Sequence, residues 1–341
     1  MVVVIAIVGL ALLFPFARWL AKRSEEQRPR QQDRTFSSVA IFCVVMAIWT
    51  MVAPGKAQVR GVYPLGMSAT NSGVTPEPGF TYSNAFLFYS RDQLKGANGE
   101  LIATGLNSVL MDMNSFVWVS KKKIGMLGGP VYSFVATLPI ANNSLTSNAQ
   151  GSISGGGGFA DSYYQPFILG WKAKRVDVRA IYGFLAPTGR FDASSNSNVG
   201  SGYWTQCISG GESFYLTDNK ATSISAFELY EFHSVQEGTG VHPGQTLNLD
   251  YSLTQTVPLK NDLRLQVGLV GYQQWQTTDK RGPTITPDQA KAHYRVNTLG
   301  FASNVMLPAR KVSLGVKYFR EFSNRSTLQG YSLQISGAVS F

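Results

Sequence analysis

The chain carries three histidines, His233, His242 and His293, and histidine is both the commonest metal ligand and a general base near neutral pH. They show no short metal-ligand spacing, and no cysteine motif stands beside them. A serine hydrolase would also need a nucleophile, a histidine and an acid together, yet the sequence has no G-x-S-x-G motif. We therefore expect no metal site, no cofactor and no enzymatic activity.

A run of four glycines, Gly155–Gly158, resembles a phosphate-binding loop only in composition. The Lys-Ser/Thr pair and the helix that would follow in such a loop are missing. We interpret the run as a flexible outer loop that leads into Phe159.

Charged side chains stand at alternate positions of several apolar stretches. Asp250 lies in LNLDYSL, Asp177 and Arg179 lie in RVDVRAIYGF, Arg264 lies in LRLQVGLV and Lys317 lies in KVSLGVKYF. Side chains of a strand alternate between its two faces, so these charges share the face opposite the apolar one. Two interpretations remain open: ion pairs that hold an inner wall together, or a constriction that selects solutes.

The same alternation ends the chain, in TLQGYSLQISGAVSF. Every second residue counted back from Phe341 to Tyr331 is apolar or small, and the residues between them are small or polar. A strand with these two faces fits either a soluble β-sandwich or the closing strand of an outer-membrane barrel. The rest of the chain decides between them.

The body of the chain divides into twelve strand-like stretches without helical periodicity. They are residues 79–91, 106–120, 125–140, 159–172, 175–187, 202–217, 221–234, 245–257, 262–276, 293–307, 311–323 and 328–341. Short connections are predicted at 121–123, 172–175, 218–220, 258–261 and 308–310. Long ones, rich in turn residues, are predicted at 92–100, 141–158, 188–200, 235–244 and 277–292.

Alternating short and long connections are typical of outer-membrane barrels, which have short periplasmic turns and longer outer loops. We therefore predict an all-β fold: a transmembrane antiparallel β-barrel of about twelve strands over residues 79–341, with both ends in the periplasm. Charges on the lipid face are costly, and most charges fall on the opposite phase. The stretch TSISAFELYEF is ambiguous, and we interpret its Glu228 and Tyr230 as inward-facing.

The first 57 residues read as a leader. Two apolar runs, Val2–Phe16 and Val39–Ala53, flank a basic stretch, and the second run ends before a small-x-small pattern. A basic segment, an apolar core and small residues make a secretory signal, so we predict cleavage after Ala57.

Residues 58–78 precede the first strand and have proline and glycine but no strand pattern. Tyr63, Leu65 and Met67 would be poorly placed in water, so we expect this segment to fold into the barrel as a plug, the alternative being a disordered leader. We predict a substrate path lined by Tyr63, Leu65, Met67, Asp177, Arg179, Glu228, Tyr230, Asp250, Arg264 and Lys317.

Several pieces of the body form a set that resembles an outer-membrane family named for the meta pathway of phenol degradation. They are Asp161, Gln165-Pro166, Leu169-Gly170-Trp171, Tyr182-Gly183-Phe184, Pro187-Thr188-Gly189, Pro243-Gly244, LDYSL at 249–253, VGLVGYQQWQTTD at 267–279 and the aromatic end. The resemblance covers roughly residues 60–341 and departs from the pattern at GFAD, residues 158–161, and in the long leader. It implies a barrel like the fatty-acid channels and a role as a transporter or channel, with no catalytic residues.

These observations predict a channel in the outer membrane of a Gram-negative bacterium that takes up small hydrophobic or aromatic compounds. A structural or adhesive barrel is the alternative, and an outer-membrane enzyme trails behind both. The expected partners are the solute, outer-membrane lipid and the barrel assembly machinery, for which Phe341 is the predicted signal. The net charge of +10 comes from scattered basic residues, so we expect no nucleic-acid binding. The oligomeric state stays open.

Overall fold

The computed structural model describes residues 60–147, 151–195 and 197–341. The predicted leader, residues 1–57, and the cleavage position at Ala57 lie outside the described residues. Among the described residues, no helix has the length and apolar composition needed to cross a membrane.

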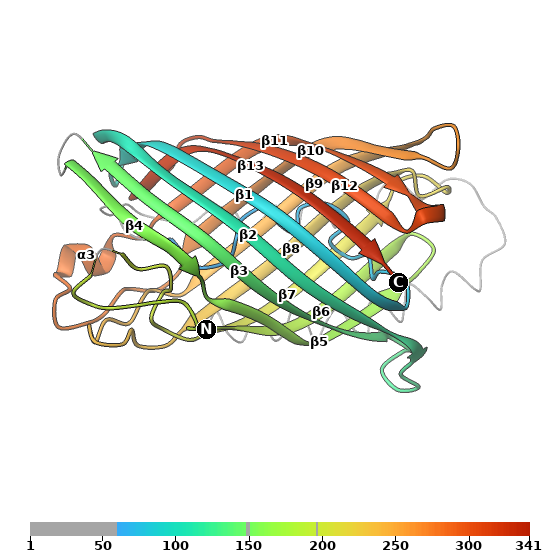
Figure 1. Cartoon of the computed structure of the whole chain (residues 1–341), viewed down its shortest axis with the longest axis horizontal. Helices are drawn as coiled ribbons and strands as arrows, with labels where there is room; N and C mark the ends of the chain where they lie inside the picture. Colours follow the sequence, from blue (N-terminus) through green and yellow to red (C-terminus); the bar gives the residue numbers. More distant parts are fainter. Residues whose placement is uncertain (1–59, 148–150, 196) are drawn as a thin grey trace, which may run out of the picture. The chain divides into compact units, whose positions relative to one another are not determined.

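Thirteen strands form one antiparallel sheet that closes on itself (Figure 1). They are β1 (Gly79–Lys95), β2 (Leu101–Lys123), β3 (Val131–Ser147), β4 (Gly151–Phe159), β5 (Ser162–Lys172), β6 (Val176–Ala186), β7 (Thr205–Tyr215), β8 (Thr222–His233), β9 (Thr246–Pro258), β10 (Arg264–Gln276), β11 (Arg295–Leu307), β12 (Val312–Glu321) and β13 (Thr327–Ser340). Two short helices, α3 (Pro287–Lys291) and η1 (Pro308–Arg310), lie in connections.

The barrel closes where β1 pairs with both β2 and β13. One part of β3 pairs with β4 and the other part pairs with β5, so β4 and β5 together take the place of one wall strand. The result is a closed barrel of twelve strands with one extra strand, which confirms the predicted fold class. Each of the twelve predicted stretches overlaps an observed strand.

The two ends of the barrel differ in their connections. The turn end carries the short connections at 124–130, 173–175, 216–221, 259–263 and 308–311. The loop end carries the longer connections at 187–204, 234–245 and 277–294. Gly79 and Phe341 both lie at the turn end, where the amide of Phe341 donates to the carbonyl of Phe80 at 2.8 Å.

Two predicted connections are wrong. Residues 141–147 and 151–158 are not a loop, because they belong to β3 and β4, which pair there, and the glycine run belongs to β4. Lys121–Lys123 belong to β2, and the turn follows at 124–130. Strand pairing beyond the barrel wall satisfies backbone hydrogen bonds there, a benefit that residue type alone does not reveal.

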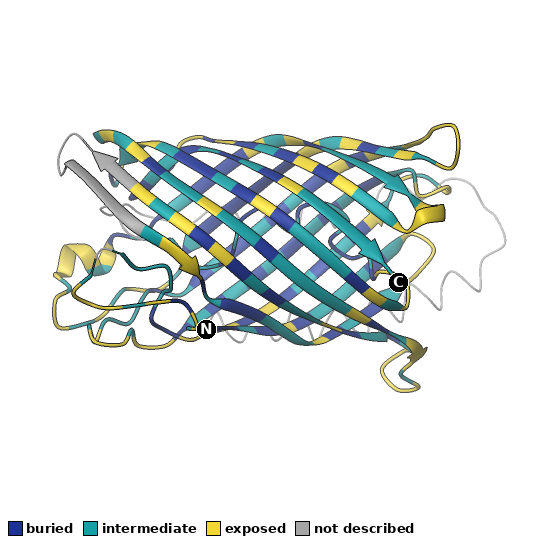
Figure 2. Ribbon diagram, viewed as in Figure 1, coloured by how far each residue is buried: buried dark blue, intermediate teal, exposed yellow. Residues whose placement is uncertain are grey.

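Buried and exposed residues alternate along the wall strands (Figure 2). In β13, Ser332 and Gln334 are buried inward, whereas the outward-facing Ile335 is 49% exposed, as predicted from the tail. Aromatic rings gather on the outer face in two groups. Phe341, Phe80 and Phe116 form contacts near the turn end, and Phe88, Tyr331, Tyr318 and Phe301 form contacts nearer the loop end.

Candidate functional site in the lumen and at its mouth

Residues 60–78, which we call the lumen segment, run inside the barrel from the loop end to the turn end (Figure 1). Arg60 contacts Glu321 at the loop end of β12, with a shortest N–O distance of 2.6 Å. Glu77 pairs at 3.3 Å with Lys172, which ends β5 at the turn end. Few of the contacts between these two points are local, so the barrel wall fixes the path of the segment.

Asp250 holds the middle of the lumen segment. Its carboxylate accepts the hydroxyl of Tyr63 at 2.8 Å and the amides of Gly66 and Ser68 at 3.0 and 3.1 Å. The side chain is fully buried, and three donors from the segment satisfy a charge that water cannot reach. β9 supplies this group because its alternation aims Asn248, Asp250 and Ser252 inward.

Lys317 and Gln334 hold the same part of the segment from the opposite wall. The ammonium of Lys317 donates to the carbonyls of Gly66 and Met67 at 2.9 and 2.7 Å. The amide of Gln334 donates to the carbonyl of Leu65 at 2.7 Å. These bonds satisfy backbone carbonyls that have no strand partner.

Nearer the turn end, Arg179 donates to the carbonyl of Ser72 at 2.7 Å. The amide of Gly73 donates to the hydroxyl of Ser213 at 3.0 Å. Asn71 and Gln266 exchange two side-chain hydrogen bonds, at 3.1 and 2.9 Å. The lumen segment is therefore bound along its length by side chains of the wall.

The loop end of the segment is anchored by a buried ion cluster. Both terminal nitrogens of Arg60 donate to Glu321, at 2.6 and 2.8 Å, and Arg91 lies 3.9 Å from the same carboxylate. Glu321 also accepts the hydroxyl of Tyr272 and the amide of Gly330. Two cations and several neutral donors thus surround one buried carboxylate.

The structure brings most of the predicted path residues together, but as contacts between segment and wall. Tyr63 and Leu65 are 6% and 3% exposed, and Met67 packs against both buried clusters. Asp250, Lys317 and Arg179 bind the backbone of the segment. Asp177 instead bonds within the wall, to Tyr215 at 2.7 Å and Lys220 at 3.4 Å.

Three further predicted positions do not join this set. Glu228 and Tyr230 were predicted to face inward and lie on the outer face instead, because β8 turns Phe227, Leu229 and Glu231 into the lumen. Arg264 has the inward phase of β10 but is exposed at the turn end.

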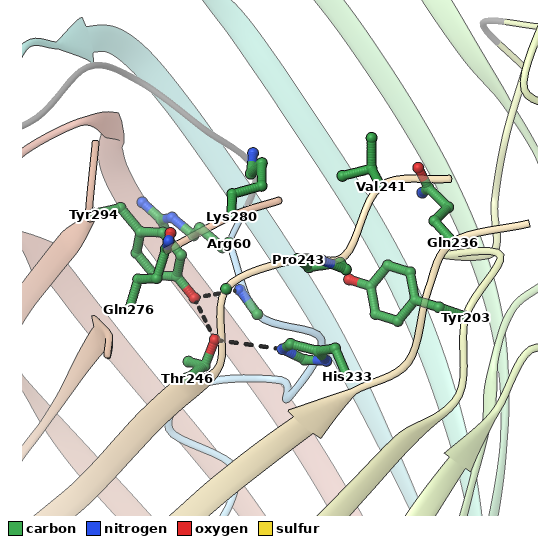
Figure 3. A pocket seen from close by; sticks show the side chains of 12 residues that line it. Arg60, Tyr203, His233, Gln236, Val241, Pro243, Thr246, Gln276, Lys280 and Tyr294 are labelled. Carbon is green, nitrogen blue, oxygen red and sulfur yellow. Dashed lines mark hydrogen bonds between the residues drawn. The ribbon is translucent and has the colours of Figure 1, made fainter. Parts of the chain in front are cut away.

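A pocket of about 110 Å³ opens above the lumen segment at the loop end, and we call it the mouth pocket (Figure 3). Its lining residues come from the segment, from the ends of three wall strands (β8, β9 and β10) and from three loop-end connections. They are Arg60, Gly61, Tyr203, His233, Gln236, Val241, Pro243, Gly244, Thr246, Gln276, Lys280 and Tyr294.

A chain of hydrogen bonds fixes one wall of the mouth pocket (Figure 3). The amide of Gly61 donates to the hydroxyl of Tyr294 at 2.7 Å, and that oxygen lies 2.8 Å from the hydroxyl of Thr246. Thr246 lies 3.4 Å from Nε2 of His233, whose Nδ1 lies 2.8 Å from the hydroxyl of Thr205. Both ring nitrogens of His233 therefore contact threonine hydroxyls of the barrel wall.

Two polar groups of the pocket remain free to meet a ligand. Nε2 of Gln276 donates to the carbonyl of Thr278 at 2.7 Å, while its buried Oε1 has no partner within the described part of the chain. Burial lowers the pKa of Lys280, and none of the described carboxylates pairs with its ammonium. The pocket therefore offers one acceptor and one cation between apolar walls.

Sequence reasoning missed these residues, although two of its family-like pieces contain them. Pro243-Gly244 and the run at 267–279, which includes Gln276, converge on the mouth pocket. The spacing of three separate connections along the chain carries no signal that they meet. No group of three or more His, Cys, Asp or Glu side chains that could hold a metal occurs among the described residues.

The comparisons with known proteins agree with this architecture. A family model described as "Putative MetA-pathway of phenol degradation" matches residues 91–336. The chain belongs to this family. No curated protein sequence matches it.

Among solved structures, the chain is similar to an outer membrane channel from Pseudomonas putida F1, with a TM-score of 0.62 and 12% identity over 82% of this chain and 100% of that one. The β-domain of the Bordetella autotransporter BrkA has a TM-score of 0.46 and 10% identity, covering 78% of this chain and 100% of that one. At such identities the likeness to the channel shows the fold alone, which is that of outer-membrane β-barrels.

Proposed function

We propose that this chain is an outer-membrane channel for the uptake of small hydrophobic or aromatic compounds. Its family is named for phenol degradation, and a solved structure that it resembles in fold is an outer membrane channel. The loop end faces the cell exterior and the turn end faces the periplasm, as the unequal connections favour.

The observation that carries the proposal is the way in which the lumen is filled. Asp250, Lys317 and Arg179 bind the lumen segment through its backbone. A structural or adhesive barrel would be filled by wall side chains that pair with one another. Here the filling is a separate stretch of chain held by non-covalent bonds, so it is able to leave without dismantling the wall.

In this proposal the lumen segment is a plug that a solute must displace. The solute enters the mouth pocket from outside. It then follows the path that opens when the hydrogen bonds between the segment and the wall break and the segment moves aside. Buried apolar side chains of the segment, including Tyr63 and Leu65, offer an apolar solute a surface away from water at about 25 cal/mol per Å² of buried area.

Locking the lumen segment to the wall tests the proposal. Asn71→Cys and Gln266→Cys place thiols where two side chains now hydrogen-bond, within reach of a short reducible thiol cross-linker. Cross-linking should abolish uptake of labelled phenol by cells, and a reductant should restore it. The variants with only one of the two substitutions, Asn71→Cys or Gln266→Cys, are treated identically and are the controls.

Uptake that continues with the segment locked would contradict the plug. Uptake equal in cells with and without the protein would contradict the channel itself and favour a structural or adhesive barrel. The proposal assigns no catalytic step to any residue.

A further inference from the structure

The mouth pocket has the size of a single aromatic ring. Its volume of about 110 Å³ is close to that of the engineered apolar cavity of about 150 Å³ that binds benzene. Tyr203, Tyr294, Val241 and Pro243 supply apolar and aromatic walls. A long acyl chain or a fused-ring compound would have to extend beyond it.

Most polar groups of the pocket are already occupied by the protein. Arg60 is engaged by Glu321, and both nitrogens of His233 face threonine hydroxyls. Gln236 donates to the carbonyl of Ser201 and accepts from Thr239. A ligand therefore meets few groups that are free to recognise it.

Besides the ammonium of Lys280, the side-chain oxygen of Gln276 is such a group. Its side chain is 2% exposed, and its Oε1 has no hydrogen-bond partner within the described residues. The orientation of the amide is fixed, because only Nε2 can donate to the carbonyl of Thr278. A buried amide oxygen without a donor is costly, and a ligand with a hydroxyl group would supply the missing donor.

We infer that the mouth pocket recognises the hydroxyl group of a phenol-type ring, with Gln276 Oε1 accepting the hydroxyl proton and the rings of Tyr203 and Tyr294 flanking the ligand. This inference rests on the proposed function and names its preferred substrate class. A phenolic hydroxyl has an ordinary pKa of about 10 and keeps its proton at neutral pH. Its oxygen can accept from the ammonium of Lys280, which lines the same pocket.

The same geometry discriminates against related rings. Toluene has no donor and leaves Gln276 Oε1 unpaired. Anisole has the oxygen but not the proton, and benzoate is an acceptor that cannot donate. A site that hydrogen-bonds a ligand hydroxyl strongly rejects analogues that lack it, because its own polar group is then buried unpaired.

Binding to the purified full-length barrel tests the inference without any need for transport. Phenol, anisole, toluene and benzoate are compared by ligand-detected NMR titration, with empty micelles as the blank. Phenol should bind the unmodified protein about tenfold more tightly than each of the other three. Equal binding of phenol and anisole would overturn the inference, and this comparison requires no variant.

Gln276→Met then removes the acceptor while keeping an unbranched side chain of similar length. Phenol binding should fall about tenfold, to the level of toluene, while toluene binding stays unchanged. Gln206→Met, at an exposed glutamine of β7, is the matched control and should keep the preference for phenol. A Gln276→Met barrel that folds, as judged by heat-modifiable mobility, and still prefers phenol would contradict the role of Gln276.

Failure here is distinguishable from failure of the proposed function. Phenol uptake without any preference in binding removes this inference and leaves the channel. Selective binding without uptake removes the channel and leaves the recognition site.

Discussion

At the scale of single residues, the buried carboxylate of Asp250 holds the lumen segment against the barrel wall. One carboxylate accepts from three donors of the lumen segment, and Lys317 binds the segment carbonyls beside it. Removing one partner from such a set leaves other buried groups unsatisfied, which costs more than the lost bond alone. The retention of the segment should therefore be unusually sensitive to this side chain.

Asp250→Asn should weaken the hold on the segment by about 1–3 kcal/mol, because an amide cannot accept at both of its heavy atoms. The expected result is more frequent channel opening in single-channel recordings in planar bilayers. Tyr63→Phe removes one of the three bonds and should have a smaller effect. Asp218→Asn, on an exposed turn, is the control, and an Asp250→Asn barrel that stays closed like this control would speak against this role of Asp250.

Glu228 presents the opposite case, a carboxyl on the outer face of the barrel. It stands midway along β8, and the carboxyl groups of Glu228 and Glu212 lie beside Gly210. A charge on the lipid face costs free energy that grows toward the bilayer centre, though less for acids than for Lys or Arg. The position therefore lowers the stability of the barrel in lipid.

Glu228→Leu should raise the free energy of unfolding in lipid vesicles by about 1–2 kcal/mol, since it replaces a lipid-facing carboxyl with an apolar side chain. The measurement is the midpoint of urea unfolding, with the outward-facing Ile224→Leu as a control of unchanged polarity. A decrease in the free energy of unfolding would contradict this expectation and would mean that another group hydrogen-bonds the Glu228 carboxyl.

At the scale of elements, the strands and their phase were largely predictable from sequence. The period of two depends on one residue and its neighbours, so β6, β9, β12 and β13 face as their patterns indicate. β8 was not predictable in this way, because apolar residues occupy both of its faces. Phe227 faces inward and packs against the ring of Tyr63, with the ring centroids 5.7 Å apart. The sequence of β8 alone does not indicate this contact.

The mouth pocket was beyond sequence reasoning for a related reason. Gly61, Tyr203, Gln276 and Tyr294 belong to four different parts of the chain that meet only when the barrel has closed. An unpartnered amide oxygen is also invisible in a sequence, since it depends on which donors the fold leaves nearby. The sequence predicted that the charged side chains of the wall face inward. It did not predict that these side chains bind backbone groups of the lumen segment.

The connections at the two ends predict how proteases will act on intact cells. In the proposed orientation the loop end faces the cell exterior, so trypsin should cleave in the connection 277–294, where Arg281 and Lys291 are exposed. It should spare Lys260 in the turn 259–263, which that orientation places in the periplasm. Mass spectrometry of the released peptides identifies the sites, and isolated outer membranes opened to both sides are the control. Cleavage at Lys260 on intact cells would invert the orientation.

The last strand closes the sheet, and its end is fixed by few contacts. Phe341 donates its amide to the carbonyl of Phe80, and the two rings lie 6.0 Å apart between centroids. Phe341→Ala should lower the folded, heat-modifiable fraction in the outer membrane, because it removes the aromatic contact and the predicted assembly signal. Phe341→Tyr keeps the ring and should assemble normally. Equal yields of all three proteins would contradict a role in assembly.

At the scale of the whole molecule, the direction of the lumen segment constrains how the protein matures. The segment leaves β1 at the turn end and reaches the loop end at Arg60, where Glu321 and Arg91 enclose it. In the proposed orientation the turn end lies in the periplasm, so Arg60 lies at the end of the barrel that faces the cell exterior. An apolar leader kept on the protein would have to pass through a lumen that the segment itself fills.

Protein isolated from outer membranes should therefore begin downstream of both apolar runs, at Gln58 if the peptidase cuts after Ala57. N-terminal sequencing of the folded, heat-modifiable band measures this directly. An epitope placed between Gln58 and Val59 should also be accessible to antibody on intact cells, while one in the turn 259–263 should not. A folded protein that retains the run Val39–Ala53 would show that the segment enters the lumen by another route, because that run could not reach the loop end without crossing the filled barrel.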